Sequence, residues 1–130
     1  MATHVGTSGL VKWNGSNTVA EVTGFSLSET NDTVEDTSLT DSAKSYLVLR
    51  KDATATVECH WDETDSNGQE ALDVGTSATL ELYPEGADAG DAYYTATAIV
   101  TGADVAVTMD GTITRNFTFQ ISGGVTHNTV

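Results

Sequence analysis

Cys59, His60 and Asp62 stand almost side by side and are the first residues whose types suggest chemistry. A thiolate, an imidazole and a carboxylate are zinc ligands, and a Cys–His pair can form a nucleophile with its base. However, the stretch Ala53–Trp61 alternates apolar and polar residues, which predicts a β-strand. Because successive side chains of a strand point to opposite faces, Cys59 and His60 diverge. We therefore predict no metal centre and no dyad here, with Cys59 and Trp61 in the core and His60 on the surface.

The acidic stretch Asp62–Asp73 is the second candidate, because a high density of carboxylates and amides is typical of calcium loops. Counted from Asp62, its glycine falls one position later than in an EF-hand, and Asp73 stands where the bidentate Glu belongs. A short helix explains the stretch better, since Ser66 can cap it and Gln69 completes a capping box. A weak surface cation site is the alternative. We predict a short helix of two turns at most, without a bound metal.

Other signatures of catalysis are missing from the sequence. It holds neither a Gly-x-Ser-x-Gly elbow nor a glycine-rich phosphate loop, and its three histidines are far apart. Its single cysteine excludes an internal disulfide. We expect a protein that is not an enzyme, with no catalytic residue, no metal and no cofactor.

The charge balance limits the possible partners. Five Lys and Arg stand against 19 Asp and Glu, so the formal net charge is −14. Nucleic-acid binding depends mainly on Lys and Arg, and so does binding to anionic lipids. The sequence also lacks an apolar run of about 18 residues, and Met1–Leu10 lacks the basic start and apolar stretch of a signal peptide. We expect no membrane binding, no specific nucleic-acid binding and no export signal.

The elements that position any site are strands. The clearest alternation is Thr112–Ile121, where Arg115 shares an apolar face with Phe117 and Phe119. A charge on such a face lies at the sheet margin, pairs with an acid or contacts another subunit. A hairpin turn is predicted just before it, at Asp110-Gly111. The other predicted strands are Gly9–Trp13, Val19–Leu27, Tyr46–Arg50, Ala53–Trp61, Ala78–Tyr83, Tyr93–Thr101 and Asp104–Met109.

The chain has 130 residues, which is the length of one domain. Many short strands separated by turn residues indicate a sandwich or a barrel. We predict a single all-β domain over residues 1–130, a mainly antiparallel β-sandwich or barrel with one short flanking α-helix and a long acidic loop.

That loop is the segment Glu29–Lys44, which contains few apolar residues. Loops of this length are uncommon inside compact domains and are either functional or disordered. Two interpretations stay open: a solvated loop, or an arm that orders on a neighbouring subunit with Val34 and Leu39 as its apolar anchors. The candidate inter-subunit residues are Glu29, Asp32, Val34, Glu35, Asp36, Leu39, Asp41, Lys44 and Arg115.

The order of these parts is itself informative. An N-terminal strand (Gly9–Asn14) and a second strand are followed by the long polar loop, a hairpin ending at Val57–Asp62, a short helix, and the strands Thr79–Pro84, Tyr93–Thr101 and Phe117–Gly123. This order resembles a siphophage-type tail tube protein (major tail protein) over nearly the whole chain.

The resemblance implies homohexameric rings that join their inner sheets into one barrel and stack into a hollow tube. DNA passes through such a tube on its way into the host, without specific binding, and other tail proteins occupy the tube ends. The loop 29–44 and flexible terminal arms, 1–8 and 125–130, would contact the neighbouring ring. The implied location is the virion, after assembly in the host cytoplasm.

A channel lined by so acidic a chain repels phosphates, so DNA slides through it. The outward strand residues Glu58 and Glu81 are the candidate lumen residues. Two other interpretations stay open. One is a ligand- or carbohydrate-binding β-sandwich, which requires a cluster of outward aromatic side chains. The other is a different ring-forming tail component, such as a terminator or connector.

Overall fold

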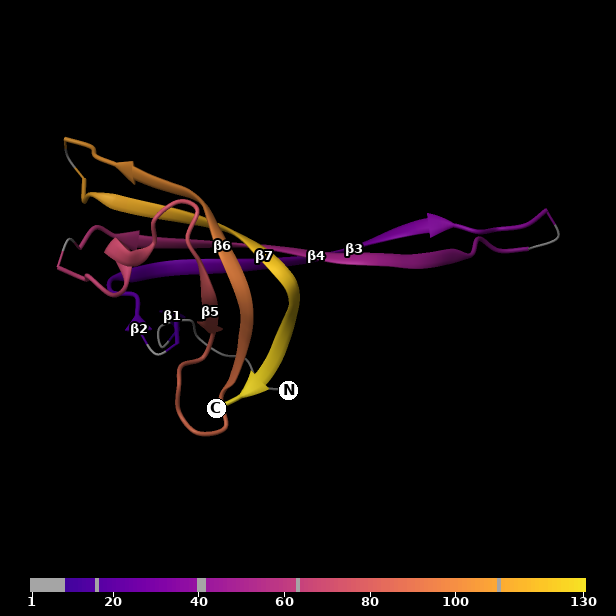
Figure 1. Ribbon diagram of the computed structural model, residues 1–130, viewed down its shortest axis with the longest axis horizontal. Helices are drawn as coiled ribbons and strands as arrows, with labels where there is room; N and C mark the ends of the chain where they lie inside the picture. Colours follow the sequence, from indigo (N-terminus) through magenta and orange to yellow (C-terminus); the bar gives the residue numbers. More distant parts are fainter. Residues whose placement is uncertain (1–8, 16, 40–41, 63, 110) are drawn as a thin grey trace.

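Figure 1 shows the computed structural model of the chain, which describes residues 9–15, 17–39, 42–62, 64–109 and 111–130. Its strands are β1 (Leu10–Trp13), β2 (Asn17–Thr18), β3 (Val22–Glu35), β4 (Tyr46–His60), β5 (Ser77–Tyr83), β6 (Ala92–Ala106) and β7 (Thr114–Thr129). They form one antiparallel sheet in the order β2-β1-β5-β6-β7-β4-β3. The all-β prediction is confirmed. The barrel alternative is wrong, because the edge strands β2 and β3 do not pair and the sheet stays open.

The sheet curls so that strands distant within it pack against each other. The ring of Trp13 in β1 lies 5.6 Å from the ring of Phe119 in β7, measured between centroids, although β5 and β6 separate these strands in the sheet. This packing encloses the apolar face that each strand presents at alternate positions. The buried core is Val11, Trp13, Val19, Ala53, Ala55, Val57, Cys59, Leu72, Leu80, Leu82, Ala98, Val100, Phe117, Phe119 and Ile121.

Two predicted pairs of strands are single long strands. Tyr46–Arg50 and the predicted strand Ala53–Trp61, except Trp61, belong to β4, and most of Tyr93–Thr101 and Asp104–Met109 belongs to β6. β6 ends at Ala106 and is joined to β7 in an antiparallel hairpin, as predicted. The register of β6 shifts between Val100 and Gly102, and this irregularity interrupts the apolar alternation, so that the sequence pattern divides β6 into two strands.

The C-terminal residues 125–130 are not a free arm. β7 continues to Thr129, which pairs with Ala92 of β6, and the backbone of Val130 bonds with Gly90 and Asp91. The sequence pattern missed this because the stretch is polar and glycine-rich, and its order comes from the partner strand. The predicted arm over residues 1–8 lies outside the described residues.

The predicted helix over Asp62–Asp73 is wrong. This segment is a loop with a single 3-10 turn, Gln69–Ala71. Its polar side chains bond to distant backbone groups instead of capping a helix, as described below. Trp61 is also not in the core: β4 ends at His60, and Trp61 is 41% exposed. No helix in the described part of the chain is long and apolar enough to cross a membrane.

The predicted long loop Glu29–Lys44 is mostly a hairpin. β3 runs on to Glu35 and pairs with β4 as far as Tyr46, so that residues 36–45 alone connect the strands. We call residues 29–52 the arm. It projects far from the rest of the molecule, on the right of Figure 1. The loop prediction failed because the β3 half of the arm has little apolar alternation, and β4 supplies its order.

Candidate functional site

The arm has open strand edges on both sides within the described chain. β3 is an edge of the sheet, and β7 pairs with β4 only between Thr54 and His60. Among the described residues, the edge of β4 from Tyr46 to Ala53 is therefore left without a neighbouring strand. A two-stranded ribbon is marginally stable alone, and unpaired strand edges are templates for pairing with another chain. This geometry makes the arm a candidate surface for protein contact.

Apolar side chains cover both faces of the arm. Tyr46, Leu47, Val48 and Leu49 follow one another in β4 and are 52, 52, 72 and 51% exposed. Consecutive residues of a strand point to opposite faces, so neither face is purely polar. A run of exposed apolar residues is unfavourable in water and is typical of a surface that another molecule covers.

The predicted anchors Val34 and Leu39 belong to the same surface. Val34 lies opposite Leu47 in the strand register and is 46% exposed, and Leu39 is fully exposed near the tip. Sequence analysis missed the larger part of the apolar surface, Tyr46–Leu49. The available signal was the run of four apolar residues, which does not fit a strand with one face in water.

Charges of opposite sign follow the two strands of the arm. Of the predicted contact residues, Glu29, Asp32, Glu35 and Asp36 are exposed on the β3 side, and Lys44 is exposed near the start of β4. Asp41 lies outside the described residues. Arg50 and Lys51 of β4 are also exposed, so three of the five Lys and Arg of the chain lie in the arm.

The base of the arm borders a hollow of about 390 Å3, where β7 turns away from β4. The turn occurs at Gly123, whose φ of 86° suits glycine. His127 of β7 crosses back to the arm, with its Nε2 atom 3.5 Å from Oε1 of Glu29. The amide of Gln120 donates to the carboxylate of Asp52 at 2.7 Å. These polar contacts connect the arm to β7 on both sides of the turn at Gly123.

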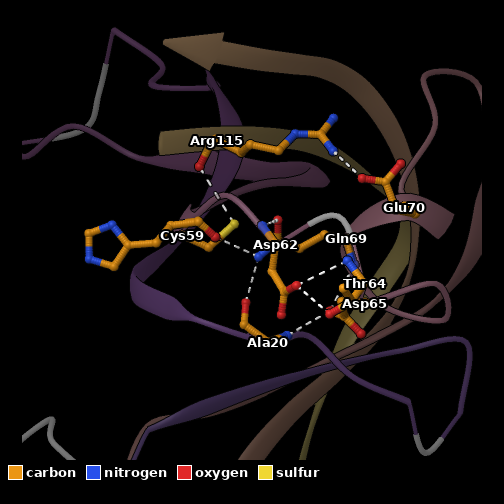
Figure 2. Close-up of polar contacts among 9 residues, drawn as sticks. Ala20, Cys59, Asp62, Thr64, Asp65, Gln69, Glu70 and Arg115 are labelled. Atoms are coloured by element: carbon orange, nitrogen blue, oxygen red, sulfur yellow. Dashed lines mark hydrogen bonds and ion pairs between the residues drawn. The ribbon is translucent and has the colours of Figure 1, made fainter. Parts of the chain in front are cut away.

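The loop after β4 is held by a buried amide, shown in Figure 2. Gln69 is fully buried, and its Nε2 atom donates to the carbonyl oxygens of Ala20 and His60, both at 2.7 Å. Its Oε1 atom accepts from the backbone N–H of Asp62 at 3.0 Å. The carboxylate of Asp65 accepts from the N–H groups of Ala20 and Gln69. Such a satisfied polar network fixes one arrangement of the loop.

Two carboxylates of the suspected calcium loop, those of Asp62 and Asp65, are thus engaged with the chain. Asp62 accepts from the backbone and the hydroxyl of Thr64, and these bonds lower the pKa of Asp62. Asp65 bonds to backbone N–H groups. Among the residues that the structure describes, no three His, Cys, Asp or Glu side chains gather as metal ligands.

Arg115 pairs with an acid of the same chain. Its Nη1 atom lies 3.5 Å from Oε1 of Glu70 (Figure 2). Its guanidinium stacks over Phe117 at 4.7 Å from the ring centroid. Its side chain is only 14% exposed. Of the alternatives for this residue, the structure thus shows pairing with an acid, and a role in subunit contact stays a prediction. Beside it, burial raises the pKa of the Cys59 thiol to about 11, which leaves the thiol unreactive at neutral pH.

The face of the sheet opposite the core is polar across four strands. Three rows of it follow from the register: Ser26, Thr56 and Thr118; Ser28, Thr54 and Gln120; and Glu58, Asn116 and Asp104. Glu81 of β5 lies opposite Thr95 of β6 and belongs to the same face. The two predicted lumen residues thus share one face, which we call the polar face. Glu58 is exposed, whereas Glu81 is half-buried and bonded to the hydroxyl of Tyr83.

No protein-family model and no curated protein sequence matches the chain. Solved structures do match over almost all of it. A chain of the virion of the native gene transfer agent particle aligns with a TM-score of 0.78 at 17% identity, covering 97% of this chain and 99% of that one. A chain from an extracellular contractile injection system, in the PVC sheath/tube terminator structure, aligns with a TM-score of 0.73 at 8% identity, covering 98% of each chain. One from the PVC sheath-tube complex reaches 0.71 at 10% identity, covering 98% of this chain and 93% of that one.

At these identities the likeness shows the fold. The chain has the open, antiparallel β-fold found in chains of gene transfer agent particles and of contractile injection systems. The resemblance to a tail tube protein, predicted from the order of the strands, is confirmed at this level.

Proposed function

We propose that the chain is a structural subunit of a phage-like tail, which assembles with copies of itself into a hollow tube. The arm carries this proposal, because its exposed apolar run and open strand edges need a covering partner. The shared fold with chains of tail and injection-system assemblies supports a second copy as that partner. No enzymatic role is proposed.

Copies of the chain close into six-membered rings, and the rings stack. Joining the open edges of neighbouring sheets removes strand edges that a single copy leaves exposed. Six-fold symmetry is supported by another similar structure, the tail of the empty gene transfer agent particle, which was obtained by helical refinement with C6 symmetry. Its chain aligns with a TM-score of 0.78 at 16% identity and covers 97% of this chain and 99% of that one.

The polar face lines the channel of this tube. Glu58 and Glu81 lie on it among hydroxyl side chains, so the wall presents carboxylates and neutral donors to passing DNA. Like charges repel phosphates, and DNA slides through without specific binding on its way to the host. The tube belongs to the virion, is assembled in the host cytoplasm and contacts other tail proteins at its ends.

The arm contacts a neighbouring copy through Val34, Leu39 and the run Tyr46–Leu49. Its exposed charges, Glu29, Asp32, Glu35, Asp36 and Lys44, form the polar rim of this contact together with Asp41, which lies outside the described residues, and Arg115 takes part from the body. A rim of charge around an apolar centre is typical of protein interfaces.

The two alternative functions are a carbohydrate-binding module and a tail terminator. For a carbohydrate module, the stacked pair Tyr83 and Tyr93 would be the platform, but Tyr83 is only 5% exposed. Tyr46 and Trp61 are exposed but stand at the two ends of β4. A terminator is the second candidate, because the similar chain of the injection system comes from a sheath/tube terminator structure.

Negative-stain electron microscopy of the purified chain tests the proposal. The sample is concentrated in steps at low and high salt, because salt screens the repulsion between copies that each have a net charge of −14. We expect hollow tubes or stacked rings that increase with salt. Single rings that never stack would favour the terminator. Dispersed monomers at every concentration and salt level would contradict both.

A further inference from the structure

A second exposed apolar surface lies at the end of the molecule opposite the arm, on the left of Figure 1. It consists of Trp61 after β4 together with Val105, Val107 and Met109 around the end of β6. These side chains are 41, 55, 68 and 99% exposed, respectively. We call these four residues the end patch.

The end patch begins where the core face runs beyond the core, at Val105. In the register, Val57, Phe117 and Ala103 form one row of this face, and Val57 and Phe117 are fully buried. The next row ends at Val105, which is already more than half exposed. One step further, the N–H of Trp61 donates to the carbonyl of Ile113 at 2.9 Å, which holds Trp61 at this end. The end of β6 therefore extends beyond the part of the curled sheet that covers the core face.

We propose that the end patch of one copy receives the arm of the next copy. This inference rests on the proposed function, and it adds the surface on which the arm docks. The occupant is the arm because its run Tyr46–Leu49 is an apolar surface of the same kind, exposed on the same chain. An exposed tryptophan among aliphatic side chains is typical of the centre of an interface.

The charges of the two surfaces are complementary. The β4 strand of the arm carries Arg50 and Lys51, both exposed. Asp104 is exposed and directly precedes Val105 of the end patch, and Glu70, which pairs with Arg115 in the row of Val105, is 44% exposed. In a chain with 19 acids and five bases, the arm is the segment that brings cations to this acidic end. Docking therefore joins opposite charges around an apolar centre.

The positions of the arm and the end patch at opposite ends of the molecule also explain how a tube grows along its axis. A contact between opposite ends of identical molecules leaves one free arm and one free end patch on every assembly. Such a head-to-tail contact does not close on itself as a pair. It adds further copies in one direction, which is what stacking of rings requires.

Matched variants separate this inference from the proposed function. The arm variant is Leu47→Asp with Val48→Asp, the end-patch variant is Val107→Asp with Met109→Asp, and the control is Val74→Asp, at a valine that is 64% exposed and outside both surfaces. Circular dichroism confirms folding of each. We expect tube mass in a pelleting assay to fall by about tenfold or more in the arm and end-patch variants, and to stay unchanged in the control.

Disulfide trapping tests the contact itself. One chain carries Leu49→Cys and a second carries Val107→Cys, both in a Cys59→Ala background, and they are mixed and oxidised. We expect a covalent heterodimer, and at least about tenfold less of it when Val74→Cys replaces Val107→Cys. Normal tubes from the end-patch variant, or equal trapping at both positions, would overturn the docking inference but leave the proposed function intact. A wild-type chain that never assembles would refute the proposed function itself.

Discussion

Replacing Gln69 with leucine tests whether one buried amide holds the loop after β4. Leucine has nearly the same size and is apolar, so the substitution removes hydrogen bonds and creates little empty space. The carbonyl oxygens of Ala20 and His60 and the N–H of Asp62 then lose their partner. Gln69 is fully buried, so water cannot replace the bonds without opening the loop.

The magnitude follows from the count of bonds. Each net hydrogen bond contributes roughly 1 kcal/mol, so the loss of the three bonds of Gln69 lowers the free energy of unfolding by about 3 kcal/mol. In a domain of 130 residues this corresponds to a fall in Tm of about 10 °C. The same loop offers a control, Asn67→Leu, because Asn67 is exposed and its replacement changes stability by less than about 0.5 kcal/mol.

Urea unfolding followed by circular dichroism measures both variants. The measurements use the background Leu47→Asp with Val48→Asp, so that assembly does not add to the apparent stability. A loss below about 0.5 kcal/mol for Gln69→Leu, equal to that of Asn67→Leu, would refute the reasoning that this amide fixes the loop.

Two further predictions concern the polar face. Burial, followed by the bond to Glu81, raises the pKa of Tyr83 above its usual value of 10.0. The pKa of Tyr83 is higher in the folded than in the unfolded state, so the stability linked to this group is complete below pH 10 and is lost as the pH rises above it. In urea unfolding, the free energy of unfolding of Tyr83→Phe should therefore fall less between pH 9 and pH 11 than that of the wild type. An unchanged fall would contradict this prediction. Glu58→Lys places a cation on the proposed channel wall, so we expect its tubes to retain added DNA at low salt and release it at high salt. Tubes with the exposed Asp73→Lys are the control, and equal DNA retention by both would argue against the polar face as the wall.

Local patterns identified much of the fold. The alternation around Val57 and Phe117 predicted the paired strands β4 and β7 in their body parts and most of the side chains that face the core. It also separated Cys59 from His60, and the structure shows Cys59 buried with its thiol bonded to the carbonyl of Arg115. Alternation is a property of a few neighbouring residues, and a strand buried on one face shows it whatever its partners are.

The loop after β4 shows where local reasoning failed. Ser66 and Gln69 have the spacing of a capping box, but Gln69 bonds to Ala20, which is 49 residues away in the chain. Ser and Gln side chains can form a hydrogen bond with the start of a local helix or with a distant backbone group equally well. Tertiary packing selects between them, because the part-buried carbonyls of Ala20 and His60 need donors.

The sequence by itself determined the strand class, the core faces, the strong acidity and the presence of an unusual polar segment. Tertiary structure alone decided that this segment is a paired arm, that the arm carries the exposed run Tyr46–Leu49, and that an end patch stands at the opposite end of the molecule. The physical reason is that exposure is not a local quantity. Leu47 and Val57 are both apolar residues of β4, but only Val57 has β7 beside it and the curled sheet above it.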